Sequence, residues 1–104
     1  MEKVSALIRK EILELPNVKQ GVSRYGSRPA FLVSGREFAH FHNEEELDIR
    51  LPFEEHKISN TWSNPYSSKW LYFKVRNEED ARIALRLIKL AYRKAVNEKK
   101  YHYG

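Results

Sequence analysis

The sequence predicts an α+β fold in which a helix, four strands and a second helix follow one another along the chain. Apolar residues repeat with a helical period at both ends, in residues 3–15 and 78–97, and alternate with polar residues in between. At 104 residues the chain forms a single domain, with a core over about 3–97. We expect one four-stranded antiparallel sheet with both helices packed on one face. The alternative is a helix on each face, which would bury both sides of the sheet.

The first helix is expected over residues 3–15 and the last over 78–97. In the first helix the apolar positions are Val4, Leu7, Ile8, Ile12 and Leu15, and Pro16 follows them. In the last helix, Asn77 is a natural N-cap, and the three acidic residues after it suit the positive end of the helix dipole. The tail, residues 98–104, is expected to fray.

The four strands are predicted from short apolar or alternating runs. They cover residues 30–34, 36–42, 47–52 and 70–76. Ser34–Gly35 predicts a tight turn between the first two strands. Residues 17–29 hold two glycines and a proline, and residues 53–69 are rich in Ser, Asn and Pro, so both segments are expected to be loops.

Composition narrows the class of protein. The chain has no cysteine, which excludes disulfides and thiolate metal sites and fits a reducing compartment. It has no apolar run of the roughly 20 residues that a membrane helix needs. The charged N-terminus does not resemble a signal peptide, so we expect a cytoplasmic protein with no membrane partner.

Strand alternation sorts the side chains into an apolar face and a mixed face. The apolar set, expected to pack on the helices, is Ala39, Phe41, Leu47, Ile49, Leu51, Leu71, Phe73 and Val75. The opposite face then collects Phe38, His40, His42, Asp48, Arg50, Trp70 and Tyr72. Apolar walls combined with a few polar groups are typical of a small-molecule site. The sequence therefore predicts such a ligand on this face.

His40 and His42 are the candidate catalytic residues, and three interpretations of the pair compete. They bind substrate or transfer protons, since histidine titrates near neutrality; they are structural and hydrogen-bonded; or they bind a metal with Asp48. We favour the first and assign no metal ligands, because the other two histidines lie in segments without a predicted position. If the pair lies off the core, His40→Ala and His42→Ala leave the fold largely intact but reduce ligand binding, whereas Phe41→Ala opens a core cavity.

The remaining candidates are ligand-binding residues. Arg28 precedes Pro29, which holds the chain extended, so its guanidinium can grip a carboxylate, phosphate or enolate or form a salt bridge within its loop. Trp62 is a candidate lid, because a bulky aromatic residue in a Ser- and Asn-rich loop needs a surface to pack on. Trp70 either walls the site or covers the sheet, and Asp48 and Arg50 either serve the ligand or pair with each other.

The net charge of +5 raises nucleic acid as an alternative partner. Part of this charge forms a basic stripe on one face of the last helix, made of Arg82, Arg86, Lys89 and Arg93. The simpler interpretation is the solvated face of an amphipathic helix. The sequence contains none of the phosphate-binding, dinucleotide-binding or hydrolase motifs, which leaves kinases, nicotinamide dehydrogenases and hydrolases unsupported.

Several stretches resemble the luciferase domain family over residues 17–93. They are the Arg28–Pro29 pair, G-R-E-x-A-H-x-H at 35–42, L-D-x-R-L-P at 47–52 and W-x-x-F-x-V-R at 70–76. The family includes fungal luciferases, which oxidise a polyphenolic pyrone with molecular oxygen and no known flavin or nucleotide. The resemblance implies an oxygenase without a cofactor, acting on a phenolic or enolisable substrate. The alternative is a non-enzymatic basic module that binds nucleic acid or an acidic protein.

Overall fold

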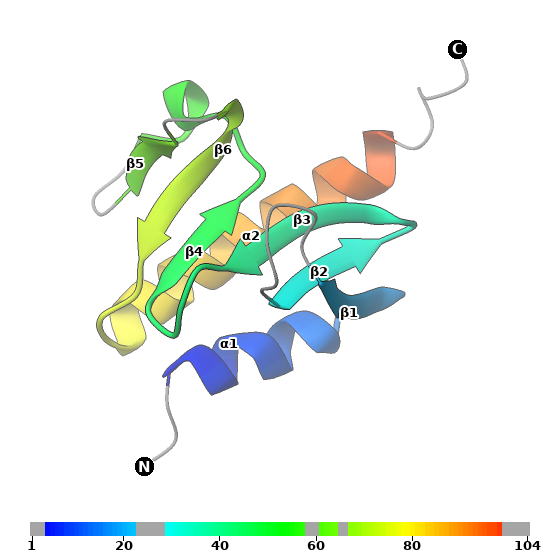
Figure 1. The fold of residues 1–104 in the computed structure, drawn as a ribbon, viewed down its shortest axis with the longest axis horizontal. Helices are drawn as coiled ribbons and strands as arrows, with labels where there is room; N and C mark the ends of the chain where they lie inside the picture. The colour runs from blue at the N-terminus through cyan, green and yellow to red at the C-terminus, as the bar shows by residue number, and fades with distance from the viewer. Residues whose placement is uncertain (1–3, 23–28, 58–60, 65–66, 99–104) are drawn as a thin grey trace.

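The computed structural model describes residues 4–22, 29–57, 61–64 and 67–98, and it contains two helices and one antiparallel sheet (Figure 1). The helices are α1 (Val4–Leu13) and α2 (Glu78–Glu98), and a short 3₁₀ helix, η1, spans Phe53–Glu55. The strands are β1 (Val18–Val22), β2 (Pro29–Val33), β3 (Arg36–Phe41), β4 (Glu46–Ile49), β5 (Thr61–Asn64) and β6 (Ser67–Lys74). Their order in the sheet is β1-β2-β3-β4-β6-β5.

The expected four-stranded sheet is wrong, because the sheet has six strands. The additional strands, β1 and β5, lie in the two segments that were expected to be loops, and each forms one edge of the sheet. An edge strand exposes much of its surface and so carries a weak apolar pattern. In β1 a Cβ added at Gly21 would lie 3.1 Å from Leu32 Cδ1, so glycine leaves room for the Leu32 side chain of β2.

The structure confirms the predicted turn after β2 and the predicted N-cap of the last helix. Ser34 and Gly35 have φ of 54° and 78° and connect β2 to β3, as a two-residue hairpin with positive φ at both positions requires. The Asn77 Oδ1 atom accepts a hydrogen bond from the Asp80 N–H at 2.8 Å, which confirms the predicted N-cap of α2. The first helix is shorter than predicted and ends at Leu13.

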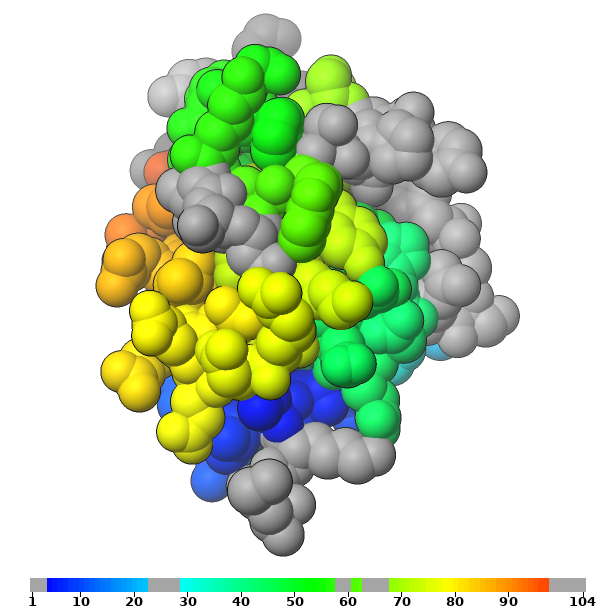
Figure 2. Space-filling model, turned by 90° about the vertical axis from the view of Figure 1, so that its left-hand side faces the viewer, coloured from blue at the N-terminus to red at the C-terminus, as the bar shows by residue number. Residues whose placement is uncertain are grey.

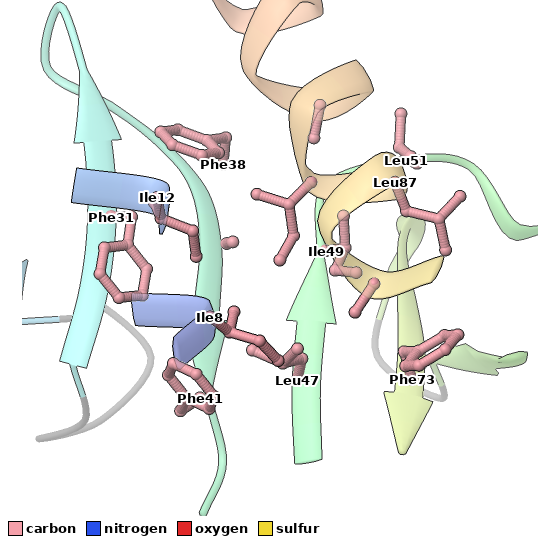
Figure 3. Packing of buried hydrophobic residues seen from close by; sticks show 14 of the residues in the cluster. Ile8, Ile12, Phe31, Phe38, Phe41, Leu47, Ile49, Leu51, Phe73 and Leu87 are labelled. Carbon is pink, nitrogen blue, oxygen red and sulfur yellow. The ribbon is translucent and has the colours of Figure 1, made fainter. Parts of the chain in front are cut away.

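Both helices pack on the same face of the sheet, as expected. One buried cluster combines Ile8 and Ile12 of α1, Ala84 and Ile88 of α2, and apolar side chains of the central strands (Figure 3). In the space-filling view, the beginning of α2 (yellow) lies beside α1 (blue), and the two helices contact each other (Figure 2). We call the opposite face of the sheet the open face. Within the described residues, neither helix has the length and apolarity needed to cross a membrane.

Candidate functional site

A cross-strand row of side chains places the candidate residues on the open face. His40 of β3 pairs with Asp48 of β4, which in turn pairs with Tyr72 of β6. The row ends at the sheet edge with Trp62, which pairs with Tyr72 from β5. The adjacent row, Ala39, Ile49 and Leu71, belongs to the helix-packed core. Since neighbouring residues of a strand point to opposite faces, the row that contains His40 lies on the open face.

Four side chains form one hydrogen-bonded group, which we call the polar cluster: Glu37, His40, His42 and Asp48. His40 Nε2 and His42 Nε2 lie 2.8 and 2.6 Å from the same atom, Asp48 Oδ2. The other ring nitrogen of His40, Nδ1, lies 2.7 Å from Glu37 Oε2. Two imidazoles therefore converge on one carboxylate oxygen, and a second carboxylate holds the far side of one ring.

An irregularity in β3 brings Glu37 into this group. The pairing of β2 with β3 shifts between Phe31 and Leu32: Phe31 pairs with Ala39, whereas Leu32 pairs with Glu37, and Phe38 is the extra residue. Such a bulge interrupts the alternation of side chains. Glu37 thereby joins His40 on the open face, although regular alternation would place the two on opposite faces.

The same bulge moves Phe38 into the core, so its predicted place on the mixed face is wrong. Phe38 is fully buried in the core (Figure 3). Its ring centroid lies 5.7 Å from that of Tyr92 on α2. The two histidines follow the bulge and keep the face that alternation predicts.

His40 donates one hydrogen bond from each of its two ring nitrogens, and both acceptors are carboxylates. Both of its ring nitrogens face carboxylates, which only accept hydrogen bonds when ionised, so both nitrogens carry a proton. Burial alone would lower the pKa of His40, but the hydrogen bonds to Asp48 and Glu37 outweigh it and raise the pKa to about 9. The metal-free cluster at neutral pH therefore holds His40 as an imidazolium.

Two aromatic rings pack against the polar cluster, and a third ring packs against one of them. Trp70 lies 5.2 Å from the His40 ring, and Tyr72 lies 5.9 Å from the His42 ring, measured between centroids. Trp62 contacts Tyr72 edge-on at 5.5 Å. Tyr72 is held in place by Glu46: burial and its hydrogen bond to this carboxylate raise the pKa of Tyr72, and the bond lowers the pKa of Glu46.

The cluster reaches the protein surface through one of its members. The side chain of His42 is 31% exposed, compared with 6% for His40 and 4% for Asp48. His42 is therefore the member of the cluster that a molecule on the open face can reach, and Tyr72 lies between it and Trp62, which is 47% exposed on the edge strand. His40 and Asp48 support His42 from below.

The other predicted site residues have different positions. Trp62 is not a loop lid, because it belongs to strand β5, where its partner is Tyr72. Arg50 is half-buried and directly follows β4, and its backbone N–H donates to the Phe38 carbonyl at 3.0 Å. Arg28 lies outside the described residues, as do residues 99–104 of the predicted frayed tail.

Sequence reasoning missed two carboxylates of the site. Glu37 carries no sequence signal, because only the bulge brings it to the open face. Glu46 was assigned to a turn, although its carbonyl accepts a 2.7 Å hydrogen bond from the His42 N–H. The available sequence signal for Glu46 was its place directly before the predicted strand of residues 47–52, because β4 begins at Glu46.

These observations define the protein as a small α+β domain with histidines and carboxylates on the sheet face opposite its two helices. The model of the luciferase domain family matches residues 35–91, which is more than half of the chain and includes the whole polar cluster. The chain belongs to the luciferase domain family. A search of curated proteins found no match.

Proposed function

We propose that the open face binds a small planar molecule with an acidic hydroxyl group, such as a phenol or an enol. The observation that carries this proposal is the convergence of His40 and His42 on Asp48 beside two aromatic rings. Ligand sites combine apolar walls with a few polar groups that fix orientation. Trp62 and Tyr72 supply the wall at the sheet edge, and His42 supplies the accessible polar group.

The polar cluster suits a ligand hydroxyl that can give up its proton. With His40 doubly protonated, Asp48 and Glu37 are each paired with it, and His42 is oriented by its hydrogen bond to Asp48. Because Nε2 of His42 faces Asp48, the other ring nitrogen of a neutral His42 is an acceptor that can take the proton of a ligand hydroxyl, and the imidazolium that forms then pairs with the ligand anion. We assign His42 to direct contact with the ligand and His40 to positioning, with Arg50 and Arg28 as additional cations.

Membership in the family supports an enzymatic form of this proposal, an oxygenase that uses molecular oxygen. An enolisable or phenolic substrate S–H would lose a proton to the site, and its anion would take up O₂ at carbon. The resulting peroxide then regains the proton, so S–H and O₂ give S–OOH. The substrate supplies both electrons, and neither a reductant nor an organic cofactor is required.

The two tryptophans make the binding step directly measurable. Both tryptophans of the chain lie at the site, Trp62 against Tyr72 and Trp70 against His40, so intrinsic fluorescence reports on it. We expect a saturable change in fluorescence when a panel of phenols and 1,3-diketones is titrated into the protein. His42→Ala should weaken binding of the best ligand at least about tenfold, the loss of one charge-assisted hydrogen bond.

The matched control is His56→Ala, because His56 is half-buried like His42 but belongs to no part of the polar cluster. This variant should bind the ligand as the unmodified protein does. The proposal fails if no member of the panel gives a saturable change at millimolar concentration, or if His42→Ala and His56→Ala bind equally well.

The basic stripe on α2 favours a second candidate function, the binding of a polyanionic partner. Arg82, Arg86 and Arg93 are exposed, with Lys89 half-buried between them. A stripe of this kind suits a polyanionic partner such as nucleic acid. Labelled oligonucleotides, titrated at two salt concentrations, test this function, because binding through phosphates weakens steeply as salt rises. Lack of binding at low salt would exclude it.

A further inference from the structure

We infer that the polar cluster is a binding site for a first-row divalent transition-metal ion, with His40 Nε2, His42 Nε2 and an Asp48 carboxylate oxygen as its ligands. The inference deepens the proposed function. It rests on that function in one respect only, namely that the organic ligand would occupy the remaining coordination positions of the ion. Within the described residues, these three side chains form a group whose donor atoms all lie within 4.8 Å of one another.

The donor geometry is the first argument. Both Nε2 atoms point at Asp48 Oδ2, from 2.8 and 2.6 Å. Neighbouring ligands of an ion with bonds of about 2.0–2.2 Å lie roughly 3 Å apart, so a small outward movement of the side chains would admit the ion. Two imidazoles and one carboxylate form a donor set that suits Zn²⁺, Fe²⁺ or Co²⁺ and leaves positions for a further ligand.

Glu37 supplies the second, independent argument. Histidines that bind a metal through one ring nitrogen usually donate a hydrogen bond from the other to a carboxylate or carbonyl, which fixes the tautomer. His40 has this arrangement: its Nδ1 lies 2.7 Å from Glu37 Oε2, while its Nε2 faces the other donors. The bulge in β3 places Glu37 there, so the conformation of the strand itself provides the hydrogen-bond acceptor for His40 Nδ1.

Charge is the third argument. Within the four side chains of the cluster, Glu37 and Asp48 carry two negative charges, and both are at most 7% exposed. A divalent ion bound at Asp48 would bring two positive charges to this pair of carboxylates. Buried charges are stable when they are paired or coordinate a metal, so the ion improves the balance.

The test is direct titration of the tag-free, chelator-treated protein with ZnCl₂ and CoCl₂ by calorimetry. The matched control is the double variant His56→Ala/His102→Ala, in which His40 and His42 are the only histidines left in the chain. We expect one equivalent of metal to bind to the unmodified protein and to this control alike. His42→Ala should bind at least tenfold more weakly, and it is preferable to His40→Ala because its side chain is partly exposed.

Glu37→Gln tests the positioning role. It keeps a group that can hold the ring but removes the charge, and we expect a 10- to 100-fold loss of metal affinity. The visible absorption of bound Co²⁺ should also change in this variant, which a merely structural role would not produce. The inference is overturned if less than one equivalent binds at 1 mM metal, or if His42→Ala binds metal as tightly as the control.

The fluorescence titration with phenols and diketones, repeated with and without metal, separates the two proposals. One-to-one metal binding that depends on His42 establishes the metal site even if no organic ligand binds, in which case only the proposed function fails. Organic-ligand binding by a metal-free protein that takes up no ion overturns the metal inference alone.

Discussion

His40 has a larger structural role than its position on the open face indicated. Its side chain is 6% exposed and joins two buried carboxylates. Removal of one partner from a buried ion pair is costly, because the remaining charge is left uncompensated. The expectation that His40→Ala leaves the fold intact therefore changes, whereas that for the more exposed His42 stands.

We predict that, in metal-free protein, His40→Ala lowers the free energy of unfolding by about 3–5 kcal/mol and His42→Ala by less than about 1 kcal/mol. The reason is that His40→Ala leaves Glu37 and Asp48 buried without their shared partner. Urea denaturation of both variants, with Phe41→Ala as the reference for a core cavity, measures the difference. Equal losses in the two histidine variants would contradict this account of the cluster.

The raised pKa of His40 predicts how stability depends on pH in the metal-free protein. The folded-state value of about 9 exceeds the ordinary value of 6.5, so the stabilisation is complete below pH 6.5 and is lost as pH rises toward 9. The loss should be on the order of 3 kcal/mol, because each unit of pKa shift corresponds to about 1.4 kcal/mol.

Urea denaturation at pH 6 and pH 9, in the presence of a chelator, measures this loss. The Glu37→Gln variant is the control: without one of the two carboxylates that raise the pKa of His40, the decline over this range should be smaller. A stability that stays constant between these pH values in the unmodified protein, or identical profiles for the two proteins, would rule out the charged pairing of His40.

Among the elements, β3 determines which residues meet at the site. Its bulge sends Phe38 to the core and Glu37 to the open face, and the histidines beyond it keep the predicted side. A regular strand is predictable from alternation, but a bulge depends on the strand's partner and leaves no pattern of its own. For this reason the sequence located His40, His42 and Asp48 but not Glu37.

We predict that Phe38→Ala lowers the stability of the fold, whereas Trp62→Ala weakens ligand binding. Phe38 is fully buried against Tyr92 of α2, so its truncation should cost about 3–5 kcal/mol of unfolding free energy. Trp62 is 47% exposed on the edge strand, so Trp62→Ala should cost little stability while weakening the binding of a planar ligand. Melting temperatures and ligand titrations followed by NMR distinguish them. A stable Phe38→Ala variant would contradict the assignment of Phe38 to the core.

At the scale of the whole molecule, the sequence predicted the α+β class, the two helices and the four inner strands. These elements are the ones with a strong periodic signal, because each buries an apolar face in the core. The edge strands β1 and β5 bury much less and were mistaken for loops. A cytoplasmic location and the roles of Arg28 and the basic stripe stay predictions.

The open face is accessible because of the way the two helices are placed on the sheet. Both helices cover the same side of the sheet, so in the described part of the chain the polar cluster has no helix over it (Figure 1). A helix on each face would have buried His42 and closed the site. The architecture, and not the cluster alone, therefore supports the account of this domain as a binder of small molecules.

The most direct test of that account is the nitrogen-15 NMR spectrum of the histidine rings, recorded while the strongest-binding phenol or diketone is added. The account predicts that the His42 ring nitrogens shift as the ligand saturates, that those of His40 follow through Asp48, and that those of His56 stay unchanged. If the protein becomes saturated with ligand while the ring-nitrogen resonances of His42 and His40 do not shift, the assignment of the site to the open face is contradicted.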